Sequence, residues 1–143
     1  MEIRPFQDGE GDRLRTFWLA CGIHLRPGDD DRSLEAFARR SEGLFLVAEE
    51  NAHLVGSILA GFDGRRGWLY HVATHPDERR RGIAGTLVAR VEARLKELGC
   101  PKVNLLVLED NPYGMRFWEA IGYGREKTVE YGKALSDDRP RWR

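Results

Sequence analysis

The stretch Arg79-Arg80-Arg81-Gly82-Ile83-Ala84-Gly85 lies between an apolar, strand-like run and an amphipathic helix. The run that precedes it is Tyr70-His71-Val72-Ala73-Thr74. Apolar residues then recur every three or four positions and share one helix face: Ala84, Leu87, Val88, Val91, Leu95 and Leu98. Gly99 and Pro101 end this helix. The sequence therefore predicts a strand, a glycine-containing turn and a long helix.

A glycine-containing turn that leads into a helix is a favourable site for an anion. The first-turn N–H groups have no partner within the helix, and the helix dipole adds positive potential there. Gly82 and Ala84 carry little or no side chain, so a bulky anion can reach the backbone. The preceding Arg79, Arg80 and Arg81 add charge. We expect this stretch, the anion cradle, to bind a phosphate or diphosphate.

The cradle lacks the spacing of the P-loop and of the G-x-G-x-x-G dinucleotide motif. Its pattern, Arg79-x-x-Gly82-x-Ala84, resembles motif A of the GNAT superfamily of N-acetyltransferases. The turn His75-Pro76 precedes the pattern and a well-formed helix follows it, which supports the resemblance. The resemblance implies that the stretch binds the pyrophosphate of acetyl-CoA, the cosubstrate, through Ile83 and Gly85 as well as the residues of the motif. An ordinary helix start with solvated arginines is the open alternative.

Length and composition suit one soluble domain, which we place at residues 1–135 with a polar tail at 136–143. The 23 basic and 23 acidic residues balance, which argues against general nucleic-acid binding. No apolar run approaches the roughly 18 residues of a membrane span, so we expect a cytoplasmic protein without membrane contact. Cys21, Cys100 and the histidines form no metal-ligand pattern, and no metal is expected.

The apolar patterns predict an α+β, or mixed α/β, domain. Strands are expected at 1–6, 44–49, 54–62, 68–74 and 102–108, the last buried on both faces, with one or two closing strands in 123–135. Helices are expected to begin at Asp8 or Asp12, at Ser33 or an aspartate before it, and at Asn111-Pro112. This is also the element order of the GNAT fold. The resemblance covers nearly the whole chain and is closest to small bacterial acetyltransferases of the YpeA type.

The GNAT resemblance implies a mostly antiparallel central sheet with flanking helices, whose fourth and fifth strands are parallel and splay apart. In that fold the pantetheine arm lies in the gap and pairs with the free main chain of the fourth strand, here at Val72 and Thr74. Backbone N–H groups near Val72 or Ala73 would hold the oxyanion of the tetrahedral intermediate.

A second match is Asn111-x-x-Gly114-x-x-Phe117-Trp118, which resembles the family pattern N-x-x-A-x-x-[FL]-Y. The resemblance implies that Asn111 touches the pantetheine arm, but a helix N-cap explains the same residue equally well. Trp118 stands where the family commonly has a tyrosine that protonates the leaving thiolate. An indole N–H can donate a hydrogen bond but cannot act as such an acid. Either the enzyme needs no general acid, or another group such as Tyr113 replaces it, or catalysis is lost while coenzyme A binding remains.

The reaction implied is direct attack of an amine on the thioester, which requires a base or a water chain. Candidate bases are Glu109 and His71, although the former equally suits a solvated loop and the latter a core position. The acceptor is a primary amine of a small molecule or a protein, and the protein is expected to be a monomer or homodimer. Acidic residues at 29–31, Glu126 and Glu130 would attract a cationic amine. A non-catalytic coenzyme A-binding or interaction module and a nucleotide-binding domain of another family are the alternatives.

Overall fold

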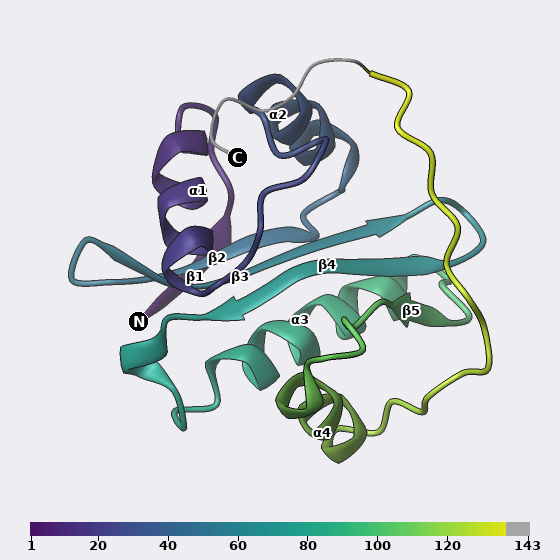
Figure 1. Cartoon of the computed structure of the whole chain (residues 1–143). Helices are drawn as coiled ribbons and strands as arrows, with labels where there is room; N and C mark the ends of the chain where they lie inside the picture. Colours follow the sequence, from purple (N-terminus) through teal and green to yellow (C-terminus); the bar gives the residue numbers. More distant parts are fainter. Residues whose placement is uncertain (137–143) are drawn as a thin grey trace.

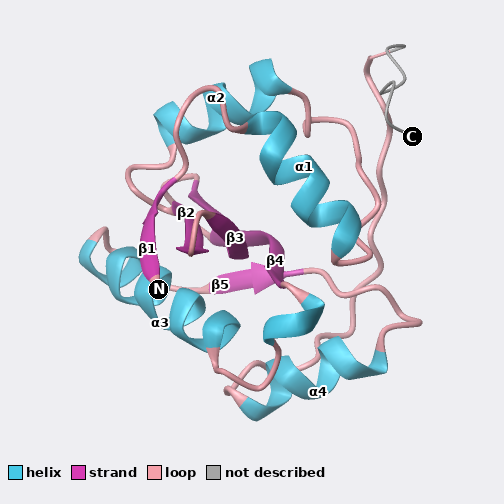
Figure 2. Cartoon of the chain, turned by 90° about the vertical axis from the view of Figure 1, so that its left-hand side faces the viewer, coloured by secondary structure: helices cyan, strands magenta, loops and turns pink. Residues whose placement is uncertain are grey.

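In the computed structural model, which describes residues 1–136, one five-stranded sheet has helices on both faces (Figure 1 and Figure 2). The strands are β1 (Glu2–Pro5), β2 (Phe45–Glu50), β3 (His53–Phe62), β4 (Gly67–Thr74) and β5 (Val103–Leu105). The helices are α1 (Gly11–Ala20), α2 (Asp31–Arg40), α3 (Ile83–Glu97) and α4 (Pro112–Ala120), with a 3-10 turn, η1 (Pro76–Glu78). The predicted α+β class is confirmed. None of the helices in this range is long and apolar enough to cross a membrane.

The strands lie side by side in chain order, from β1 to β5. Strands β1 to β4 are antiparallel to one another, whereas β5 runs parallel to β4. The parallel pairing joins Gly67 to Val103 and ends where Leu69 meets Leu105. Residues 70–74 of β4 continue beyond that last pair. The predicted parallel pair that separates at its carboxyl end is thus confirmed, and we call its point of separation the β4–β5 fork.

Two hydrophobic clusters hold the helices to the sheet. Helices α1 and α2 cover one face, and α3 and α4 lie on the other (Figure 1). The predicted apolar stripe of α3 is buried against the sheet through Leu87, Val88 and Val91. Gly56 on β3 lets this helix approach closely, because a Cβ there would lie 2.7 Å from Ile83 Cγ2. The close contact fixes where the first turn of α3 meets the sheet.

The N-terminal caps of the first two helices follow different chemistry. Asp30 caps α2, and its side chain accepts a hydrogen bond from the Ser33 N–H at 3.2 Å, which confirms the aspartate alternative. The expectation that Asp8 or Asp12 caps α1 is wrong, since the residue at that position is Glu10 and its side chain makes no cap bond. Its carboxylate instead contacts Arg4 at 2.6 Å.

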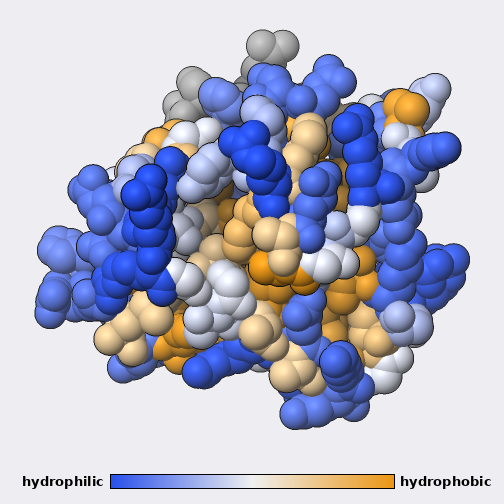
Figure 3. Space-filling model, turned by 90° about the horizontal axis from the view of Figure 1, so that it is seen from below, coloured by the Kyte–Doolittle hydropathy of each residue, from blue (hydrophilic) through white to orange (hydrophobic). Residues whose placement is uncertain are grey.

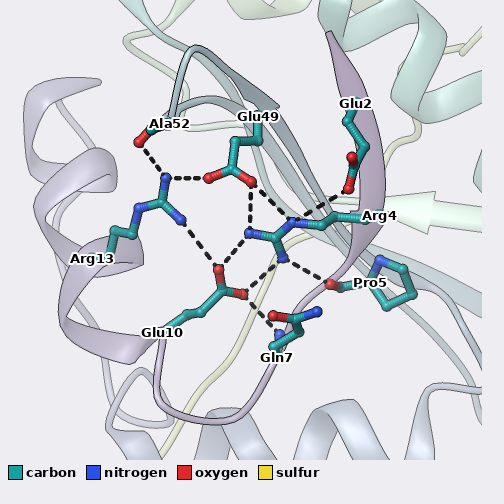
Figure 4. A network of polar contacts seen from close by, with 8 residues as sticks. All are labelled: Glu2, Arg4, Pro5, Gln7, Glu10, Arg13, Glu49 and Ala52. Atoms are coloured by element: carbon teal, nitrogen blue, oxygen red, sulfur yellow. Dashed lines mark hydrogen bonds and ion pairs between the residues drawn. The ribbon is translucent and has the colours of Figure 1, made fainter.

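That carboxylate belongs to a network that joins three parts of the fold (Figure 4). Arg4 on β1 contacts Glu10 before α1 and donates to Glu49 on β2 at 3.2 Å. Arg13 on α1 pairs with both carboxylates and donates to the Ala52 carbonyl at 2.6 Å. Hydrogen bonds from Arg13 and Arg4 lower the pKa of Glu49, although desolvation opposes them. Burial acts to raise the pKa of Glu10, but Arg4 and the Gln7 N–H together lower it.

Two strand predictions differ from the structure. The strand expected at 102–108 is only Val103–Leu105, and it is half-buried rather than buried on both faces, because no further strand of residues 1–136 pairs with its outer edge. Leu106 and Leu108 are consequently 56% and 57% exposed. Residues 123–136 contain no strand, so the closing strands expected in 123–135 are also wrong. Apolar residues remain exposed amid hydrophilic surface on the side seen in Figure 3. Of the predicted tail, residues 137–143 lie outside the described residues.

Candidate functional site

The anion cradle lies where β4 gives way to α3. Arg79 is extended, at φ −68° and ψ 159°, and Arg80 has a positive φ of 70°. Gly82 is the N-cap of α3 in the left-handed conformation, at φ 74°, which favours glycine. Because it has no side chain, it makes no cap bond to the first turn. The first-turn N–H groups are therefore left to a ligand or to water.

Open space surrounds the cradle backbone. A Cβ built on Gly82 or on Gly85 meets no atom of residues 1–136 within 4 Å. Ala84 is half-buried, and Ile83 is buried at 2% exposure beneath the turn. One side chain thus anchors the turn to the core while the backbone above it stays approachable. A diphosphate, whose oxygens accept hydrogen bonds from main-chain N–H groups, fits this geometry.

The three arginines of the cradle differ in their partners. Arg81 is engaged by two carboxylates, Glu50 at 2.7 Å and Glu78 at 2.5 Å. Its hydrogen bond to Glu50 lowers the pKa of that carboxyl. The Arg79 guanidinium lies 5.9 Å from the ring centroid of Tyr113, the second residue of α4. Arg80 is exposed. Arg81 therefore braces the turn, whereas Arg79 extends toward α4.

Strand β4 carries a bulge just beyond the fork. Ser57 pairs with Ala73 and Leu59 pairs with Tyr70, so two β4 residues, His71 and Val72, oppose one residue of β3. The backbone of His71 has a φ of 46°, which is uncommon for a residue other than glycine. Val72, within the bulge, and Ala73 and Thr74, which follow it, therefore lie beyond the last β4–β5 pair, where the predicted main-chain contacts to a cosubstrate would form.

The Cys21 thiol, at the end of α1, contacts the carboxyl end of β4. It donates to the Thr74 carbonyl with a sulfur–oxygen distance of 3.5 Å. Burial raises the pKa of the Cys21 thiol to about 11, although the Arg79 cation acts in the opposite direction. A thiol held in the protonated form is a poor nucleophile, which favours a structural role for Cys21.

The two candidate bases occupy different surroundings. His71 lies at the bulge with its side chain 17% exposed, and its Nε2 is 2.9 Å from Asp29 Oδ2. Glu109 lies in an exposed turn after β5 and makes no hydrogen bond or ion pair to any residue in 1–136. The structure thus gives His71 a fixed geometry beside the fork and leaves Glu109 in solvent.

Asn111 and Trp118 lie at opposite ends of α4. The Asn111 side-chain oxygen accepts from the Gly114 N–H at 2.9 Å, so the residue is an N-cap here. Trp118 is half-buried between Phe117 and Tyr123, with ring centroids 5.0 Å apart in each pair. Its indole N–H makes no hydrogen bond within residues 1–136 and remains available. The Tyr123 hydroxyl donates to Glu92 at 2.7 Å. Burial of the Tyr123 side chain and, to a smaller extent, this hydrogen bond raise the pKa of its phenol.

Sequence reasoning missed a cavity of about 420 Å³ at the end of the sheet where β4 terminates. Phe17 on α1, His53 at the start of β3 and His75 before η1 are among its lining residues. Three separate segments line this cavity, so no local sequence pattern predicts it. It also missed Ser57, a fully buried polar residue on β3.

Comparison with known proteins agrees with this geometry. The sequence model of the Acetyltransferase (GNAT) family matches residues 11–123. An acetyltransferase of Pectobacterium atrosepticum is 41% identical over 140 residues, spanning 97% of this chain and 99% of its own. One of Yersinia pseudotuberculosis is 40% identical over 139 residues, spanning 96% of this chain and 98% of its own.

A solved structure also shares the fold. The PaiA N-acetyltransferase of Thermoplasma acidophilum, in complex with coenzyme A, superposes with a TM-score of 0.78. The two are 22% identical, and the match covers 90% of this chain and 92% of the other.

Proposed function

Because this chain belongs to the Acetyltransferase (GNAT) family, we propose that it transfers an acetyl group from acetyl-CoA to a primary amine. The acceptor is a small molecule or a protein. The observation that carries the proposal is the open cradle: an uncapped helix N-terminus with free space at Gly82 and Gly85, next to the β4–β5 fork.

The cosubstrate binds along the path from the cradle to the fork. First-turn N–H groups of α3 hold the diphosphate, with Ile83 anchoring the turn from below. Arg79 and Arg80 supply charge, while Arg81 fixes the turn through Glu50 and Glu78. The main chain from Val72 to Thr74 pairs with the pantetheine amides, because β5 no longer occupies that edge.

The reaction is attack of a neutral amine on the thioester carbonyl. A base first accepts a proton from the ammonium, and of the two candidates His71 is the better placed, at the bulge beyond the fork. Main-chain N–H groups near Val72 stabilise the oxyanion. The available indole N–H of Trp118 donates to the sulfur, whose thiolate leaves without full protonation. Positioning both reactants contributes on the order of 7–11 kcal/mol to lowering the barrier.

A second candidate is a module that binds coenzyme A without catalysis. Trp118 favours it, because it replaces the proton-donating tyrosine of the family pattern. Asn111 favours neither candidate, since in this structure it caps α4.

Turnover and binding measured side by side test the proposal. Free-thiol release from acetyl-CoA is followed with a polyamine, an aminoglycoside, and peptides that offer an N-terminal or a lysine amine. The proposal predicts release that depends on at least one amine and saturates with it. Tight acetyl-CoA binding by calorimetry, combined with no amine-dependent release across the panel, would instead support the non-catalytic module.

A further inference from the structure

A buried chain of hydrogen bonds fixes the backbone at the β4 bulge from the α1 side. The Trp18 indole N–H on α1 donates to Ser57 Oγ on β3 at 2.9 Å. The Ser57 hydroxyl donates in turn to the His71 carbonyl at 2.8 Å. Trp18 and Ser57 are both fully buried. Two buried polar groups are thereby satisfied, and the positive φ of His71 is held in place.

The His71 ring is held as firmly as its backbone. Its Nε2 lies 2.9 Å from Asp29 Oδ2, and the Trp18 ring contacts it edge-on with centroids 4.5 Å apart. Asp29 belongs to the loop before α2 and is only 6% exposed. The Arg26 N–H donates to its carboxylate at 2.9 Å, and Arg15 donates to its carbonyl at 3.1 Å. These two hydrogen bonds therefore fix the position of Asp29 independently of its contact with His71.

The chemistry of this pair defines which histidine nitrogen carries a proton. A carboxylate only accepts hydrogen bonds, so the neutral imidazole must present its N–H at Nε2. Within residues 1–136 no hydrogen-bond partner contacts Nδ1, and the His71 side chain is 17% exposed. The charged groups around this pair include the Arg15 guanidinium, which donates to the Asp29 carbonyl, and Asp12 and Asp31, which pair with that guanidinium. Helix α1 and strand β3 also contribute Trp18 and Ser57.

We propose that Asp29 is a positioning residue that fixes His71 with its proton on Nε2, so that Nδ1 accepts the proton of the acceptor ammonium. The proposal rests on the proposed acetyl transfer. The ammonium N–H bond breaks and its proton moves to Nδ1. The amine lone pair then forms the C–N bond, and the C–S electron pair leaves on sulfur. The second proton lost by nitrogen protonates the thiolate to give the thiol of coenzyme A, and His71 returns its own proton to solvent.

The tautomer is measured without any ligand. Nitrogen-15 NMR of the histidine rings, assigned by comparison with His71→Gln, reports which nitrogen of His71 is protonated. We expect the N–H at Nε2 in the wild type and a mixture of tautomers in Asp29→Ala. Alanine removes Oδ2, the atom that accepts from the Arg26 N–H and lies against His71 Nε2, so the acceptor that selects Nε2 is gone. A wild-type ring protonated at Nδ1 would overturn the role of Asp29.

The catalytic consequence is tested with two small nucleophiles at saturating acetyl-CoA. Ethylamine arrives as an ammonium at neutral pH and needs a base, whereas hydroxylamine is largely neutral and does not. His71→Gln and Asp29→Ala should lose at least 10²-fold in kcat/KM with ethylamine. With hydroxylamine the loss should stay within about threefold.

Asp8→Asn, which removes a carboxylate from an exposed loop, is the control and should match the wild type with both nucleophiles. Equal losses with both nucleophiles would mean that the pair is merely structural and would overturn the proposal. Wild-type protein that turns over neither nucleophile would count against acetyl transfer itself, while the NMR result would still judge Asp29.

Discussion

Trp118 is the residue at which the two candidate functions predict different outcomes. Its ring packs between Phe117 and Tyr123 against the core, and its N–H has no partner in residues 1–136. A tyrosine in the same place is smaller and offers a hydroxyl that can protonate the thiolate. The Tyr123 hydroxyl does not substitute for it, because it donates to Glu92.

We predict that Trp118→Tyr retains or raises turnover, because the new hydroxyl adds a proton donor while the ring still packs. Turnover is measured as free-thiol release from acetyl-CoA, with the amine of the panel that the wild type acetylates fastest. Trp118→Phe is the control, since it removes the N–H without supplying a hydroxyl, and we expect it to be slower than Trp118→Tyr. Complete loss of activity in Trp118→Tyr would mean that the indole itself is required.

For single residues of the site, the sequence predicts the candidates but not the residues that they contact. His71 and Asp29 were both considered, one as a base and the other as part of an acidic loop. Their contact joins positions 42 residues apart, and no local periodicity encodes such a pairing. Asn111 had two equally good interpretations, and only the position of its side-chain oxygen near the Gly114 N–H shows the cap.

Among the elements, helix α3 involves two glycines that differ in the space available for a side chain. Gly56 on β3 has no room for a side chain, since Ile83 Cγ2 and Leu87 Cδ1 would lie 2.7 and 3.1 Å from its Cβ. Gly85, within the first turn of α3, has open space and helical backbone geometry.

We expect Gly56→Ala to destabilise the fold by roughly 1–3 kcal/mol through overpacking. Gly85→Ala, the matched control, should stabilise it by up to about 1 kcal/mol, because alanine favours the helix. Urea unfolding followed by circular dichroism compares both with the wild type. A Gly56→Ala protein as stable as the wild type would show that α3 can move away from β3 at no cost.

Element type was predictable wherever periodicity was strong. The α3 stripe and the runs of β2, β3 and β4 were located to within one or two residues. The error at 102–108 has a physical origin: an apolar run becomes a fully buried strand only when neighbours cover it, and β5 is an edge of the sheet.

For the whole molecule, the Arg4 network couples stability to pH. Glu10 and Glu49 have pKa values below their ordinary 4.5 in the folded protein. A carboxyl with a lowered folded pKa stabilises the fold above its unfolded pKa. That contribution is lost as the pH falls through the folded pKa.

We therefore predict that the free energy of unfolding is constant near neutral pH and falls as the pH drops below about 4.5. Arg4→Met should lower stability at pH 7 and flatten this acid dependence, because the carboxylates lose a shared partner. Arg32→Met, on the exposed surface of α2, is the control and should keep the wild-type slope. Chemical unfolding at a series of pH values measures the free energy of unfolding of each protein. An identical acid dependence in all three proteins would contradict the role of the network.

The account depends on main-chain N–H groups at the start of α3 binding the diphosphate of acetyl-CoA. Gly82 is a poor place to test it, because its φ of 74° would strain any replacement. Gly85→Leu adds a neutral side chain at a helical position that faces open space. Calorimetric titration with acetyl-CoA should show a loss of affinity of at least 100-fold relative to the wild type, in a protein with an unchanged fold. Equal affinity in the two proteins would contradict the cradle as the binding site.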